Sequence, residues 1–262
     1  MARALVFDSG VGGLSVTEAI REHLPNLKLD YAADDAFRPY GNKSAEALGA
    51  RLPGLLWSLS DMLGSDCIVL ACNTASTTAL PVIRAALDIP VIGVVPAIKP
   101  AAKASQSGHI GVLGTPGTVA RDYVDRLIQD HAQQCRVTLK GSVELVGMAE
   151  AKLTGQAIDM AALKEELNVF TQQTPPVDQI VLACTHFPLL HDELSTCLGA
   201  GVTWVDSGEA IARRVDSVLR GLNLSTVDET ARQYAFTTGD GIGAARQAVF
   251  KDYGFSRLIS LA

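Results

Sequence analysis

Residues 68–72 and 180–184 carry the same five letters, IVLAC, and this repeated stretch decides the fold. Four apolar residues without polar alternation are typical of a strand that is buried on both faces of a sheet. Each copy ends in a cysteine, and small polar residues follow it: Asn73–Thr74 after the first copy and Thr185–His186 after the second. We therefore expect both thiols at the carboxyl ends of buried strands, pointing into a cleft.

Other segments repeat in step with these strands. ALVFDSG at 4–10 is answered by HIGVLGT at 109–115, and PVIGVVP at 90–96 by GVTWVDS at 201–207. Strand-like runs alternate with helical patterns along the chain, and VELVGM at 143–148 is predicted as one of the strands. This alternation predicts an α/β fold of two pseudo-symmetric domains, with mainly parallel sheets flanked by helices and an active site at the domain interface.

The repeat also predicts the domain boundaries. The chain enters the second unit near residue 97 and returns near residue 207, so the first domain is expected to be discontinuous, with residues 1–97 plus 207–262. Residues 98–206 form the second domain. In the returning segment, YAFT at 234–237 predicts a strand and residues 244–253 predict a helix.

Length and composition restrict the functional class. A chain of 262 residues, 48% apolar and 19% charged, is long enough for two globular domains with separate cores. The net charge of −6 gives no basic surface for nucleic acid. No apolar run is long enough for a membrane span, and Met1–Phe7 does not read as a secretion signal, so a soluble cytoplasmic protein is expected. The five cysteines are an odd number without CxxC spacing, which favours reduced thiols.

Cys72 and Cys184 are the candidate catalytic residues. A racemase must remove a proton from one face of a carbon and return one to the other face, and paired thiols on matching strands meet that need. The alternative is that a buried cysteine acts as a small hydrophobic residue, which is the interpretation for Cys67, Cys135 and Cys197.

Each candidate thiol needs assistance to ionise. The ordinary thiol pKa of about 8.5 leaves only a few per cent thiolate at neutral pH. A helix N-terminus contributes about 0.3 to 1 kcal/mol, less than the ~1.4 kcal/mol of one pKa unit. Asp8, at the end of the first strand, and His186, two residues after Cys184, are placed to supply the rest.

The polar segments at the other strand ends suggest a site for a small zwitterion. FDSGVGGL at 7–14 offers Ser9 and backbone N–H groups that can converge on an anion, but the segment lacks the GxGxxG fingerprint, so a dinucleotide cofactor is not expected. Cys184, His186 and His191 lack a zinc-binding spacing, so no metal is expected either. Further hydroxyl and amide side chains could hold carboxylates and an ammonium group, although each alone is simply explained as a helix cap or turn residue: Asn73, Thr74, Ser76, Thr115, Thr118 and Thr185.

With these residues in hand, the chain resembles the glutamate racemases, which form part of the cofactor-independent aspartate/glutamate racemase superfamily. The resemblance extends over most of the chain, and its most specific segment is the N-terminal one. The segments are FDSGVGGLSV at 7–16, PYG at 39–41, CNTAS at 72–76, PVIGVVPAIKPA at 90–101, TPGT at 115–118 and CTHFPL at 184–189. Arg38 stands where the family often has an apolar residue before PYG.

The resemblance implies roles for individual residues. Cys72 would deprotonate the D-enantiomer of glutamate and Cys184 the L-enantiomer, assisted by Asp8 and His186 respectively. Glu150, in the stretch ELVGMAE, matches a family position near the second cysteine. The residues implied in substrate binding are Ser9, Pro39, Tyr40, Gly41, Asn73, Thr74, Thr115, Thr118, Glu150 and Thr185.

The resemblance further implies that D-glutamate supplies peptidoglycan synthesis, that neither pyridoxal phosphate nor a metal takes part, and that a homodimer is a possible assembly, because many members of the family form homodimers. Two alternatives stay open. The same bases would serve a racemase for aspartate or another amino acid. A module that binds an acidic amino acid without chemistry would show affinity but no solvent-proton exchange.

Overall fold

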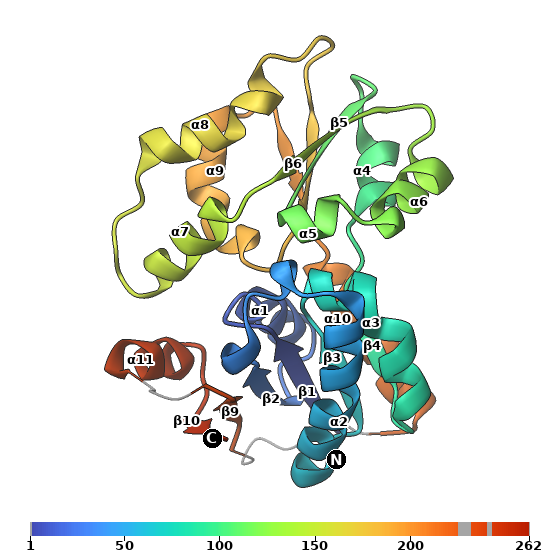
Figure 1. Ribbon diagram of the computed structural model, residues 1–262, viewed down its shortest axis with the longest axis vertical. Helices are drawn as coiled ribbons and strands as arrows, with labels where there is room; N and C mark the ends of the chain where they lie inside the picture. The colour runs from blue at the N-terminus through green and yellow to red at the C-terminus, as the bar shows by residue number, and fades with distance from the viewer. Residues whose placement is uncertain (1, 225–231, 240–242, 262) are drawn as a thin grey trace. The chain divides into compact units, whose positions relative to one another are not determined.

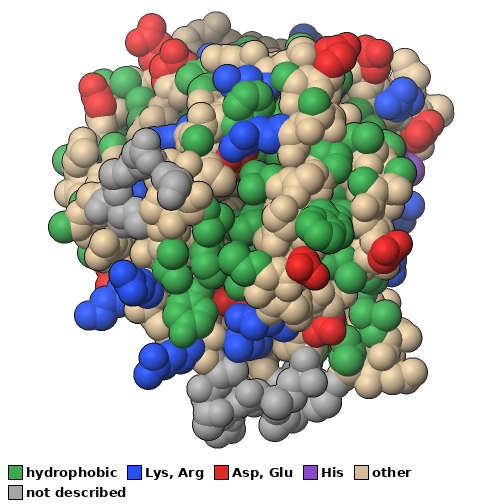
Figure 2. Space-filling view, turned by 60° about the horizontal axis from the view of Figure 1, so that its bottom comes forward, with side chains coloured by type: hydrophobic (Ala, Val, Ile, Leu, Met, Phe, Trp, Pro, Cys, Tyr) green, Lys and Arg blue, Asp and Glu red, His purple; other side chains and the backbone are tan. Residues whose placement is uncertain are grey.

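The computed structural model describes residues 2–224, 232–239 and 243–261. The chain divides into two compact units, Met1–Val94 with Gly208–Ala262 and Val95–Ser207. No helix in these described ranges is long and apolar enough to cross a membrane. The face of the molecule in Figure 2 carries hydrophobic side chains among Lys, Arg, Asp and Glu side chains of both signs.

The first unit contains a six-stranded parallel sheet with the order β10-β9-β2-β1-β3-β4 (Figure 1). Its strands are β1 (Arg3–Asp8), β2 (Lys28–Ala33), β3 (Cys67–Leu70), β4 (Val91–Gly93), β9 (Tyr234–Thr237) and β10 (Arg257–Ser260). The strand over 234–237 and the helix over 244–253 that the sequence predicts are confirmed as β9 and α11 (Ala244–Asp252).

The other helices of this unit are α1 (Leu14–His23), α2 (Ala45–Leu63), α3 (Asn73–Ala86) and α10 (Gly208–Gly221), with short 3₁₀ turns η1 (Asp35–Phe37) and η2 (Tyr40–Asn42). Helices α2 and α3 pack against each other and share a core with Leu5, Phe7, Ile68 and Leu70. Every residue of β3 is buried, which explains why its sequence lacks polar alternation.

The second unit contains a four-stranded parallel sheet with the order β6-β5-β7-β8. Its strands are β5 (His109–Gly114), β6 (Arg136–Gly141), β7 (Gln179–Ala183) and β8 (Thr203–Val205). Two cores adjoin β7, one with Ile180 and Leu182 and the other with Val181 and Ala183. The helical elements are α4 (Ile98–Ala104), α5 (Pro116–Val119), α6 (Asp122–His131), α7 (Glu144–Leu153), α8 (Met160–Thr171), η3 (Phe187–Leu190) and α9 (His191–Leu198).

The two units repeat one strand order. The series β2-β1-β3-β4 of the first sheet corresponds to β6-β5-β7-β8 of the second, so β3 and β7 hold equivalent places. Cys72 follows β3, and Cys184 follows β7 directly. The predicted α/β class with parallel sheets flanked by helices is confirmed.

The prediction of a strand at 143–148 is wrong. This segment lies in α7, and the edge strand of the sheet is β6, at 136–141. Within α7, the buried residues Leu145 and Ala149 are four apart, which is a helical spacing. The helix begins where the Ser142 hydroxyl accepts a hydrogen bond from the Leu145 N–H at 3.1 Å.

Candidate functional site

Cys72 sits where β3 passes into α3 and is only 6% exposed. It is the N-cap residue of α3, so the positive end of the helix dipole lies next to it. The thiol donates a hydrogen bond to Ser9 Oγ at 3.7 Å. The predicted cysteine and the predicted loop residue are therefore in contact.

Asp8 ends β1, the strand next to β3, and is fully buried. Its Oδ2 accepts a hydrogen bond from the Gly13 N–H at 2.9 Å. Its Oδ1 is buried and has no hydrogen-bond partner among the residues that the structure describes. A buried carboxylate oxygen of this kind can accept a hydrogen bond from a bound ammonium group or a neighbouring acid.

The loop from Ser9 to Gly13 requires its last glycine. A Cβ at Gly13 would lie 2.8 Å from Tyr31 Oη and 2.9 Å from the Asp8 Cβ. Those separations are too short for real side-chain contacts, so the close approach of the loop to β1 and β2 needs a residue without a side chain.

The predicted PYG segment is tied to a buried carboxylate that the sequence analysis missed. Tyr40 is 1% exposed, and its hydroxyl donates to Asp34 Oδ2 at 2.7 Å. Arg51, on α2, donates to both Asp34 oxygens at 2.7 and 2.6 Å, and Thr238 donates to Oδ1 at 2.6 Å. The Tyr40 hydroxyl therefore has a structural partner. Pro39, Tyr40 and Gly41 stay predicted substrate contacts.

Burial and hydrogen bonding act on Asp34 in opposite directions. Burial favours the neutral acid, but the bonds from Arg51, Thr238 and Tyr40 outweigh it and hold the pKa of Asp34 below its ordinary value. Burial, and next the charge of Asp34, raise the pKa of Tyr40, so this phenol stays a neutral donor. Arg38, the departure from the family pattern, pairs with Asp35 at 3.5 Å.

Asn73 and Thr74 form the first turn of α3, and both are 4% exposed. Asn73 Oδ1 is a second buried acceptor without a hydrogen-bond partner in the described part of the chain. Ser76 differs from them, because its hydroxyl donates to Leu70 O at 2.9 Å and accepts from Val94 N at 3.0 Å. Ser76 therefore joins β3 to the end of β4.

In the second unit, Cys184, His186 and Glu150 form a chain of contacts. Cys184 is 6% exposed, and its Sγ lies 3.8 Å from His186 Nδ1. His186 Nε2 lies 3.4 Å from Glu150 Oε1, on α7. A carboxylate that orients an imidazole, which in turn contacts a thiol, is the usual arrangement for activating a nucleophile or a base.

The threonines predicted for substrate binding lie at the same edge of the second sheet. Thr115 follows β5, and its hydroxyl lies 2.9 Å from that of Thr118, which is fully buried on α5. Thr185 follows Cys184 and is 6% exposed. Each unit thus collects its own share of the predicted residues at the carboxyl edge of its own sheet.

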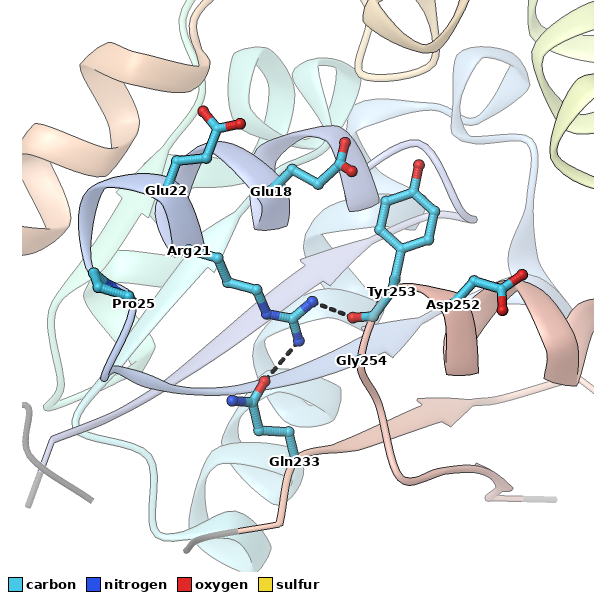
Figure 3. Close-up of a pocket in the computed structure, with 8 residues that line it drawn as sticks. All are labelled: Glu18, Arg21, Glu22, Pro25, Gln233, Asp252, Tyr253 and Gly254. Carbon is cyan, nitrogen blue, oxygen red and sulfur yellow. Dashed lines mark hydrogen bonds between the residues drawn. The ribbon is translucent and has the colours of Figure 1, made fainter. Parts of the chain in front are cut away.

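Among the described residues, no group of three or more His, Cys, Asp or Glu side chains is placed to hold a metal ion. A surface pocket of about 540 Å³ lies in the first unit, and it contains no predicted site residue (Figure 3). It is lined by Glu18, Arg21, Glu22, Pro25, Gln233, Asp252, Tyr253 and Gly254.

Comparison with known proteins assigns the family. The Asp/Glu/hydantoin racemase family pattern matches residues 10–215. The chain is 47% identical over 259 residues to a glutamate racemase of Shewanella sp. (strain MR-4), with 97% of this chain and 94% of that protein aligned.

Solved structures agree with that assignment. The structure of Escherichia coli glutamate racemase in complex with L-glutamate and the activator UDP-MurNAc-Ala superposes with a TM-score of 0.94 at 43% identity, over 100% of this chain and 98% of that one. Glutamate racemase from Aquifex pyrophilus gives a TM-score of 0.73 at 32% identity, over 97% and 95% of the two chains. The chain therefore belongs to the Asp/Glu/hydantoin racemase family and, within it, to the glutamate racemases.

Proposed function

We propose that the protein interconverts L- and D-glutamate by two-base proton transfer at Cα, with Cys72 and Cys184 as the bases. The carrying observation is that two sheets of the same strand order each end an equivalent strand at a buried cysteine. L-glutamate in the Escherichia coli relative supports the choice of substrate. In this proposal the first domain, 1–97 plus 207–262, supplies Cys72 and the second, 98–206, supplies Cys184.

The proton balance is simple. One thiolate takes the Cα proton and becomes a thiol, and the thiol of the other cysteine gives its proton to the opposite face of the same carbon. Cys72 acts first on D-glutamate and Cys184 first on L-glutamate, and no cofactor or metal takes part. After each turnover the two cysteines have exchanged protonation states, which reset through solvent.

The neighbours of each thiol explain how it can act near neutral pH. Glu150 orients His186, whose Nδ1 accepts the proton of the Cys184 thiol. Asp8, with one buried oxygen lacking a partner in the part of the chain that the structure describes, is the corresponding group for Cys72. The N-terminus of α3 and the hydroxyls of Thr115, Thr118 and Thr185 are proposed to bind the substrate carboxylates.

The first experiment follows L-glutamate with the purified protein in deuterated water, without added cofactor. Decay of the circular dichroism signal with deuterium entering at Cα is the expected result. Aspartate is assayed in parallel, and faster turnover of aspartate would contradict the substrate assignment. No exchange with either amino acid would contradict catalysis altogether.

Single cysteine variants test the bases. Cys72→Ala and Cys184→Ala should each abolish racemisation, because each removes one of two required groups. Cys197→Ala, in α9, is the matched control and should keep wild-type activity. Full activity in either of the first two variants would contradict the two-base mechanism.

The biological setting follows from the same proposal. D-glutamate is proposed to supply peptidoglycan synthesis in the cytoplasm, and the protein is proposed to form a homodimer. Deletion of the gene should make growth depend on added D-glutamate, and sedimentation of the purified protein reports the oligomeric state. Growth without that supplement would contradict the cell-wall role.

A further inference from the structure

Tyr31 is a buried residue whose hydroxyl supports the loop that carries Asp8 and Ser9. It lies in the middle of β2, paired with Val6 of β1, and is fully buried. Its hydroxyl donates a hydrogen bond to the Gly10 carbonyl at 2.8 Å. A residue of β2 thus binds the backbone of the 9–13 loop directly at Gly10.

The same hydroxyl sits against the far end of the loop. The Tyr31 oxygen would lie 2.8 Å from a Cβ at Gly13, so it closely approaches that backbone. The Gly13 N–H in turn donates to Asp8 Oδ2 at 2.9 Å. The Tyr31 oxygen therefore bonds to Gly10, the residue after Ser9, and lies close to Gly13, the residue that holds the Asp8 carboxylate.

The ring of Tyr31 is held from the other side by the C-terminal segment. Phe250 and Phe255 pack against it, with ring centroids 5.3 and 6.0 Å away. Arg21 stacks over Phe255 with Cζ 4.6 Å from the centroid, and it donates to Tyr253 O and to Gln233 Oε1 (Figure 3). The phenol therefore has little freedom to move away from the loop.

Tyr31 is also a permanent hydrogen-bond donor. Burial, and next the charges of Asp8 and Asp35, raise its pKa well above the ordinary value for tyrosine. The hydroxyl consequently stays neutral throughout the working pH range. The hydroxyl cannot serve as a base in that pH range, and its chemical role is to donate a hydrogen bond.

We propose that Tyr31 is a positioning residue for the reaction, whose hydroxyl fixes the 9–13 loop and thereby places Ser9 against Cys72 and Asp8 beside it. The inference rests on the proposed function for its kinetic consequence. Its structural consequence is independent of that function, because the loop contacts Cys72 through the 3.7 Å bond between Sγ and Ser9 Oγ.

Tyr31→Phe is the test, because it removes one oxygen and keeps the ring. We expect kcat to fall by roughly tenfold to a hundredfold, as small misplacements of catalytic groups do, with near-ultraviolet circular dichroism unchanged. The second readout is the rate of alkylation of each cysteine by iodoacetamide across pH, followed by peptide mass spectrometry. The profile of Cys72 should move to higher pH, because the Ser9 hydroxyl, which accepts from the neutral thiol, can turn and donate to the thiolate only while the loop holds it in place. The profile of Cys184 should stay in place.

Two controls separate positioning from general stability. Tyr234→Phe makes the same chemical change on β9, where Tyr234 packs in another core of the unit, and should leave kcat and both profiles unchanged. Leu63→Ala, at the end of α2, leaves the Tyr31 hydroxyl and its ring contacts in place, and it should lower the melting temperature without moving the Cys72 profile.

The outcomes are distinct. Unchanged kcat and an unchanged Cys72 profile in Tyr31→Phe would overturn the inference, and so would equal shifts of both cysteines. If the wild-type protein shows no racemisation, the proposed function fails, while the alkylation profiles still decide the role of Tyr31. Should Tyr31→Phe not fold, Gly13→Ala is the second variant, because its Cβ would clash with the Tyr31 hydroxyl and displace the loop. It is expected to move the Cys72 profile in the same way.

Discussion

The residues that lie beside the two cysteines differ between the two units. Cys184 has an imidazole at 3.8 Å, and that imidazole has a carboxylate at 3.4 Å. Cys72 has a hydroxyl at 3.7 Å, and the Asp8 carboxylate belongs to the neighbouring strand. The duplicated fold therefore does not duplicate its polar residues, which suits a substrate that differs on its two faces.

Glu150 provides the prediction for single residues. Glu150→Gln removes the charge that orients His186, so kcat should fall by roughly tenfold, and His186→Asn should lower it by about a hundredfold. Steady-state kinetics in both directions measures the two effects. Glu193→Gln is the matched control, because Glu193 pairs with Lys152 at 2.8 Å in the same unit and takes no part in the proposed chemistry. A Glu150→Gln enzyme as active as this control would remove Glu150 from the mechanism.

The elements show where sequence patterns suffice and where packing decides. The strands around both cysteines could be predicted, because uninterrupted apolar runs followed by helix-starting residues have few other interpretations. The long helix α2 is hard to predict from the sequence, because Pro53 lies inside it, although its buried leucines at 48, 52, 56, 59 and 63 keep a helical spacing. Strand β2 was missed because Asp30 interrupts its apolar pattern, and the structure satisfies Asp30 with Arg3 and the Tyr234 N–H.

The candidate site likewise contains residues that the sequence predicts and a residue, Asp34, that it does not. Its cysteines follow from the repeat, and the resemblance points to the other residues that the structure places at the two sheet edges. Asp34 could not be found from spacing, because its partners come from η2, α2 and the segment after β9. Contacts between residues so far apart in sequence leave no local pattern.

The Asp34 cluster gives the prediction for elements, because it joins α2, η2 and the segment after β9. Asp34→Asn should lower the free energy of unfolding by about 2 kcal/mol at pH 7, the size typical of a lost hydrogen bond to a charged group. A folded-state pKa below the ordinary value means that this stability is present above about pH 3.9 and is lost as the pH falls through the folded pKa. Urea unfolding between pH 7 and pH 3 should therefore show that the difference in free energy of unfolding between wild type and Asp34→Asn becomes smaller in acid. Glu209→Gln, which breaks an exposed helical pair with Arg213, should change stability by less than about 0.5 kcal/mol. A difference between wild type and Asp34→Asn that widens in acid would contradict the assignment.

The molecule contains one four-strand order twice, and its C-terminal segment extends only the first of the two sheets. Both units share a four-strand order, and the returning chain adds β9 and β10 to the first sheet only. That addition supplies Thr238 to Asp34 and the aromatic residues behind Tyr31. The part of the fold without a counterpart in the second unit thus supports the loops around Cys72.

Because one chain contains both Cys72 and Cys184, the proposed chemistry needs no residue from a second copy. Specific activity per chain should therefore stay constant when the enzyme is diluted through the range in which a dimer dissociates. Racemisation is followed by circular dichroism at each dilution, and mass photometry on the same samples reports the fraction of dimer. A parallel dilution series with added lysozyme, which does not pair with this chain, serves as the control for surface loss. Activity that falls in proportion to the fraction of dimer would show that another copy completes the site, and the assignment of both bases to an independent chain would then be wrong.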